Sequence, residues 1–88
     1  MSKLQIKMFI NKSKDGKNNI CGKNISQIRK NMKISQRKLA DLMQIAGLDI
    51  DKNAIQRIES GQRFVTDIEL KVFSKVLETR IEELLNYE

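Results

Sequence analysis

The stretch ISQRKLADLMQIAGLDIDKNAIQRIESG, residues 34–61, predicts two short helices joined by a turn. Each helix is expected where apolar residues recur at helical spacing directly after a side chain suited to capping. Ser35 is the expected cap of a helix over about 36–46, and Asp51 is the expected cap of a helix over about 52–60. A glycine near the end of each run marks where the helix stops.

The second helix of this pair has two different faces. Ile55 and Ile58 lie three residues apart, so they share one face and are expected to join the core. Asn53, Gln56 and Arg57 project from the other face, where Lys and Glu would suffice for simple solvation. Amide and guanidinium groups carry the donors and acceptors that match the edges of DNA bases. This face is therefore a candidate for reading a nucleic acid.

Three more helices are expected, at about 23–33, at about 67–77, and a last short one after Thr79 that carries Ile81, Leu84 and Leu85. Two of their starts carry the capping-box pattern, in which a Thr and a Glu three residues later cap each other: Thr66 with Glu69, and Thr79 with Glu82. Five short helices in a chain without proline predict an all-α fold.

Residues 1–21 form a basic N-terminal arm, ahead of the domain expected over 22–88. Residues 3–10 alternate apolar and polar side chains with the period of a strand, and residues 11–19 are typical of a flexible turn or linker. A lone strand would pair across a dimer, pack loosely or stay mobile. The arm is thus a short strand or a flexible arm, and its lysines either follow DNA or only keep the protein soluble.

Composition excludes several classes of site. The 88 residues suffice for one small domain, and with one cysteine, Cys21, and no histidine neither an intramolecular disulfide nor a structural zinc site is expected. No apolar stretch approaches the roughly 20 residues that span a bilayer. Neither a catalytic constellation nor a phosphate-cradling glycine loop is present in the sequence, so we expect no enzyme, no cofactor and no metal.

The net charge of +6 is unevenly distributed along the chain. Residues 1–33 carry +8, residues 34–63 carry +1 and residues 64–88 carry −3. Such polarity favours one end facing a polyanion and the other facing water or a partner, although a solvated surface is the plain alternative.

The two segments ISQIRKNMKISQRKLADLM and IDKNAIQRIESGQRFVTDIELKVFSKVLETRIEELL resemble the phage repressor/Cro-type (XRE-like) helix-turn-helix DNA-binding family, over about residues 22–86. The most specific pieces are ISQRKLA and AIQRIESG. The resemblance implies a compact repressor-like bundle containing a helix-turn-helix, and a transcriptional regulator that binds double-stranded DNA. It further implies a homodimer on an inverted repeat and a cytoplasmic, nucleoid-associated location, without a membrane or a small-molecule ligand as partner.

The resemblance also assigns roles to individual residues. Four residues of the helix at 52–60 match positions that read base edges: Lys52, Asn53, Gln56 and Arg57. Four others match positions that contact the DNA backbone: Gln36, Gly61, Gln62 and Arg63. Arg37, the cation next to Gln36, is expected to add a contact to phosphate. Glu59 and Arg29 match a structural ion pair that fixes the recognition helix to the core.

The sequence departs from the family pattern in the turn. Ala40 and Asp51 are eleven positions apart, about five more than usual in the family, so a longer first helix and an added loop are expected. Gln44 stands at the usual turn glycine, and Glu78 stands at a second usual glycine, where a left-handed backbone would be mildly strained.

A protein-interaction module on the same fold, antitoxin-like or a regulator-binding partner, is the alternative function. The acidic C-terminal third and the basic arm are compatible with it. Salt discriminates the two, because DNA binding weakens steeply as salt rises whereas an interaction module shows little affinity for nucleic acid even at low salt.

Overall fold

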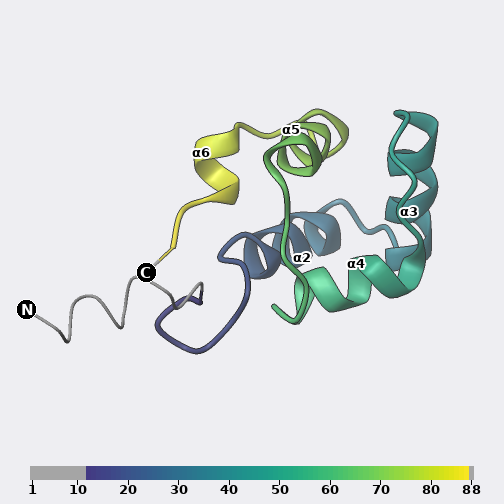
Figure 1. Cartoon of the computed structure of the whole chain (residues 1–88). Helices are drawn as coiled ribbons and strands as arrows, with labels where there is room; N and C mark the ends of the chain where they lie inside the picture. The colour runs from purple at the N-terminus through teal and green to yellow at the C-terminus, as the bar shows by residue number, and fades with distance from the viewer. Residues whose placement is uncertain (1–11, 88) are drawn as a thin grey trace, which may run out of the picture.

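The computed structural model describes residues 12–87, which contain five helices and no strand (Figure 1). The helices are α2 (Gly22–Asn31), α3 (Gln36–Ile45), α4 (Lys52–Glu59), α5 (Asp67–Val76) and α6 (Ile81–Leu84). The all-α prediction is confirmed, with every boundary within two residues of its expected place. The strand expected at residues 3–10 lies outside the described residues.

The five helices pack as a closed ring. α4 packs against both α2 and α3, α3 also contacts α5, and α5 continues through α6 back to α2. The side chains that fill the centre come from all five helices and the loop before α4, and the fully buried ones are Ile25, Leu39, Met43, Ile50, Ile55, Ile58, Phe73 and Leu84. Because Ile55 and Ile58 belong to this centre, the inner face of α4 is fixed to the body as expected.

Three of the predicted helix starts are present. Ser35 accepts a hydrogen bond from the backbone N–H of Lys38, and Asp51 accepts one from Ala54. Thr66 and Glu69 form the reciprocal capping box at the start of α5. These caps satisfy donors that the first turn of a helix leaves without intrahelical partners.

The capping box expected from Thr79 and Glu82 is wrong. α6 begins after Arg80, whose side chain makes no capping bond. Thr79 belongs instead to the turn that ends α5, where its N–H donates to the carbonyl of Ser74 and its own carbonyl accepts from the Ser74 hydroxyl. The left-handed backbone expected at Glu78 is found there, with φ of 54°.

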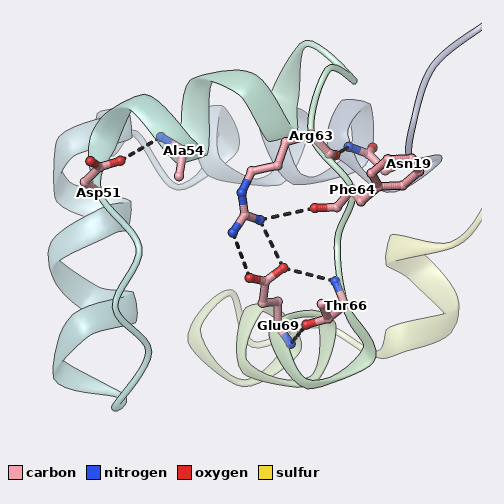
Figure 2. A network of polar contacts seen from close by, with 7 residues as sticks. All are labelled: Asn19, Asp51, Ala54, Arg63, Phe64, Thr66 and Glu69. Atoms are coloured by element: carbon pink, nitrogen blue, oxygen red, sulfur yellow. Dashed lines mark hydrogen bonds and ion pairs between the residues drawn. The ribbon is translucent and has the colours of Figure 1, made fainter.

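The added residues between α3 and α4 form a loop that runs back along α3 (Figures 1 and 2). Gly47 adopts φ of +100°, which ends α3 in a conformation that favours glycine. Gln44 donates through Nε2 to the carbonyl of Ile50 at 2.9 Å, and Ile50 itself is buried. The insertion is therefore tied down at both its ends, and α3 and α4 stay packed together.

Gly22 permits the close approach of α2 to the end of α4. A Cβ atom at this position would lie 2.0 Å from the carbonyl oxygen of Ile58. We expect Gly22→Ala to lower the free energy of unfolding by about 1–3 kcal/mol, because backbone must move to admit the methyl group. Urea denaturation followed by circular dichroism measures this, with exposed Lys23→Ala as the control. Equal stability of the two variants would contradict the close approach.

Candidate nucleic-acid interface

The outer face of α4 is exposed along its whole length. Lys52, Asn53, Gln56 and Arg57 are all exposed, and within residues 12–87 their side chains take part in no hydrogen bond or ion pair. The opposite face of α4 is buried. The helix therefore presents two amides and two cations to whatever lies against this side of the molecule.

The dimensions of α4 suit a DNA groove. With its side chains an α-helix is about 10–12 Å in diameter, which fits the major groove of about 12 Å width, and the eight residues of α4 give it a length of about 12 Å. Figures 1 and 2 both show α4 along one edge of the molecule, with α5 at the opposite edge. No other helix of the described part lies across its outer face, so the edge is open to a partner of this size.

A buried ion pair fixes the end of α4. Arg29 of α2 donates from Nε to Glu59 Oε2 at 2.7 Å and from Nη2 to Oε1 at 3.0 Å. The two side chains are only 11% and 6% exposed. A third bond joins Arg29 Nη1 to the carbonyl of Ile34 at 2.8 Å. The pair implied by the family resemblance is thus present and links α2, the turn before α3 and α4.

Gln36 lies at the same carboxylate. Its Nε2 donates to Glu59 Oε1 at 3.0 Å, and the residue is half-buried. The first residue of α3 is therefore connected to the last residue of α4. The contact of Gln36 with the DNA backbone stays a prediction; in the structure its amide positions the two helices of the motif relative to each other.

Arg63 occupies an internal ion pair and is not a free cation. Its Nη1 and Nη2 donate to the two oxygens of Glu69, each at 3.0 Å, and Nη1 also donates to the carbonyl of Phe64 (Figure 2). The same carboxylate accepts from the backbone N–H of Thr66. The contact of Arg63 with the DNA backbone stays a prediction; in the structure its guanidinium holds the loop after α4 against the start of α5.

Glu69 makes the fold sensitive to acid. Burial by itself would raise the pKa of Glu69, but hydrogen bonds from Arg63 and Thr66 outweigh burial and hold this pKa below its ordinary value of 4.5. A carboxyl whose pKa is lowered by folding stabilises the fold above the pKa of the unfolded chain, and this contribution is lost as the pH falls through the folded-state pKa.

We expect the wild type to lose more stability than Glu69→Gln when the pH is lowered from neutral to below 4.5. Glutamine keeps the cap but does not titrate, so it is the matched variant. Urea denaturation at the two pH values gives the difference directly. Parallel pH dependence in both proteins would show that the pair with Arg63 contributes nothing.

The basic segment before α2 is docked, which the sequence did not indicate. Asn18 donates through its backbone N–H to the carbonyl of Gly61 at 2.7 Å and through Nδ2 to that of Gln62 at 2.8 Å. Asn19 Nδ2 donates to the carbonyls of Ile58 at 3.0 Å and Arg63 at 2.7 Å. Of the two alternatives predicted for residues 11–19, the turn is present, closed by the N–H of Gly16 donating to the carbonyl of Ser13, and the segment is docked on the loop after α4.

The docked segment also covers Gly61. This glycine is buried with φ of +83°, and a Cβ atom on it would lie 2.2 Å from Cδ of Lys17. The space beside Gly61 is thus filled by the chain's own lysine, and the contact of Gly61 with the DNA backbone stays a prediction. Of the other residues expected at the DNA backbone, Arg37 and Gln62 are exposed.

The described residues show no other kind of site. Within 12–87 no group of His, Cys, Asp or Glu could hold a metal ion, and no helix there is both long and apolar enough to cross a membrane. Cys21 is buried, and burial raises its pKa to about 11, so its thiol stays protonated at neutral pH.

Comparison with known proteins identifies the family. The family model described as "Helix-turn-helix" (HTH_3) matches residues 25–84, which span α3, the turn and α4 as well as the helices that support them. Neither the curated proteins nor the solved structures gave a match. This family comprises DNA-binding regulatory domains that are typically not enzymes. The chain therefore belongs to the helix-turn-helix family of XRE-like, Cro/C1-type DNA-binding proteins.

Proposed function

We propose that this protein is a sequence-specific, repressor-like transcriptional regulator that places α4 in the major groove of double-stranded DNA. The observation that carries the proposal is the outer face of α4, where four polar side chains lie exposed without partners in the described chain. Their chemistry suits base edges: Asn and Gln pair with adenine, and Arg or Lys pairs with guanine O6 and N7.

The residues beside α4 position it on the backbone. Arg37 is exposed in the first turn of α3, and Gln62 is exposed in the loop after α4. Contacts from such side chains to phosphate set the register of a DNA-binding protein without reading sequence. Gln36 supports the same arrangement from within, through its bond to Glu59.

The protein is proposed to act in the cytoplasm as a homodimer on an inverted repeat. One helix of this length reads only a few base pairs, so two copies with half-sites about 34 Å apart provide the missing specificity. The apolar residues of the C-terminal end are candidates for the dimer interface, and among them Leu84 belongs to the core whereas Leu85 is 40% exposed. Leu85 and the half-buried Tyr87 are the ones that remain accessible.

Selection of bound sites from a random duplex pool tests the function. We expect an enriched inverted repeat. Its affinity should fall steeply as salt rises, with a slope of log binding constant against log salt concentration of about −0.9 for each phosphate neutralised. A single unrepeated site would contradict the dimer. No binding to any duplex at low salt would contradict the proposed function and favour the protein-interaction module.

A further inference from the structure

The segment before α2 creates a basic hollow beside the end of α4. The hollow has a volume of about 740 Å³, and the lysines that line it are Lys14, Lys17 and Lys23. Gly61, the residue that follows the last turn of α4, also lines it. We call this feature the lysine hollow. It joins a part of the chain that looked like a linker to the helix proposed to read DNA.

The lysine hollow is held in place by defined bonds. Lys17 Nζ donates to the carbonyl of Ser60 at 3.1 Å, and Lys12 Nζ donates to Oδ1 of Asn18 at 2.8 Å. Asn18 is in turn bonded to the backbone beyond α4. Of the lysines that line the hollow, Lys17 is thus attached directly to the end of the recognition helix, and Asn18 fixes the adjoining backbone to the loop after it.

Ser60, to which Lys17 is bonded, follows the exposed face of α4. Ser60 comes three and four residues after Arg57 and Gln56, so all three lie on one side of the helix axis. A helix that lies in the major groove has a sugar-phosphate backbone on each side, and the chain that follows its last turn leaves the groove past one of these backbones. Lys17 is attached at this end.

The loop after α4 has few donors of its own left for a phosphate. The backbone N–H of Gly61 donates to the carbonyl of Ile58, and those of Gln62 and Arg63 both donate to the carbonyl of Arg57. The guanidinium of Arg63 is taken by Glu69. Apart from Arg57, which is proposed to read bases, the unpaired positive charge at this end of α4 therefore comes from the docked segment.

Two acids line the same hollow, but both are engaged. Glu59 is paired with Arg29 and accepts from Gln36. Asp15 accepts from the hydroxyl of Ser13, which leaves its charge in place, so in the described part of the chain the hollow holds three lysines against one carboxylate that has no cation bound to it. Within residues 12–87 no lysine of the hollow forms an ion pair, so their charge is available to an anion.

We propose that the lysine hollow binds a phosphodiester of the DNA backbone at the groove edge next to the end of α4. This inference rests on the proposed function and extends it, because it assigns backbone contacts to the segment ahead of the helix-turn-helix. Lysine supplies three donors and a full charge without geometric demands, which suits a phosphate contact that carries no sequence information.

The test compares two variants of equal charge. Lys14→Gln/Lys17→Gln removes two charges from the hollow, and Lys71→Gln/Lys75→Gln removes two exposed charges from α5, at the opposite edge of the molecule. Binding to the selected duplex is measured over a range of salt concentrations. The slope of the logarithm of the binding constant against the logarithm of the salt concentration is expected to be shallower for the hollow variant, by about 0.9 for each phosphate that is no longer neutralised. Its affinity for unrelated duplexes should fall by the same factor as its affinity for the selected duplex. The α5 variant should keep the wild-type slope.

Lys14→Gln alone guards against a folding effect, because the Lys14 side chain makes no hydrogen bond within residues 12–87. A folded Lys14→Gln protein with a reduced salt slope supports the proposal. Equal slopes for the hollow and α5 variants, while the wild type still selects its site, would overturn the lysine hollow and leave the proposed function standing. Absence of DNA binding by the wild type would overturn both.

Discussion

Arg29→Met is expected to lower the free energy of unfolding by about 3–5 kcal/mol, the largest effect on stability of any change discussed for this fold. The substitution leaves Glu59, whose side chain is 6% exposed, with Gln36 as its remaining side-chain partner. A buried carboxylate without its counter-ion is costly because the protein interior solvates charge poorly. Urea denaturation followed by circular dichroism gives the value.

The double variant Arg29→Met/Glu59→Leu separates the pair from its parts. Replacing both members of a buried ion pair by apolar side chains is often close to neutral, so we expect the double variant to regain most of the stability. The bond from Arg29 to the carbonyl of Ile34 is absent from both variants and cancels in the comparison. A single-variant effect under about 1 kcal/mol, typical of an exposed pair, would contradict the structural role.

Arg57→Ala and Asn53→Ala are expected to remove most of the base preference of the protein, each at a different position of the half-site. A bidentate contact between a side chain and a base is worth about 1–3 kcal/mol of discrimination. Both side chains are exposed on α4, so their removal leaves the core unchanged. Affinities for a set of duplexes with single base changes show which position each variant relaxes.

Arg37→Gln is the matched control for these two variants. Its side chain is exposed on α3 and is proposed to contact phosphate, so its removal should weaken binding to every duplex alike. If Arg57→Ala also weakened all duplexes equally, Arg57 would be a backbone contact and would not read bases.

Local patterns in the sequence were sufficient to predict the helices. The caps at Ser35, Asp51 and Thr66 depend on residues within one turn of each other, which a sequence displays directly. The capping box predicted at Thr79 was wrong because Thr79 bonds instead to Ser74 of the preceding helix, in the turn that ends α5. The pattern Thr-x-x-Glu does not show which local partner prevails.

The candidate interface was predicted where it depends on helical period and missed where it depends on long-range bonds. The helical period predicts that Asn53 and Arg57 lie on the face opposite Ile55, and in the structure both are exposed whereas Ile55 is buried. Asn19, in contrast, bonds to carbonyls 39 and 44 residues away. A run of Asn, Lys and Gly has the composition of a linker, and nothing in it specifies such distant acceptors.

The partners of Gln36 and Arg63 show a second limit. Both residues suit a phosphate contact by charge or by position, and both meet a carboxylate of their own chain first. For Arg63 the acceptor is six residues away, within the capping box of α5. Sequence showed that Glu69 would cap the helix, but not that the same carboxylate also binds a guanidinium.

Methylation interference on the selected duplex tests the central claim most directly, because it reports which groove α4 occupies. Dimethyl sulfate modifies guanine N7 in the major groove and adenine N3 in the minor groove. If α4 lies in the major groove, methylation of a guanine N7 in each half-site blocks binding, and this block disappears in Arg57→Ala. Interference confined to adenine N3, with guanine N7 methylation tolerated throughout the site, would contradict that placement.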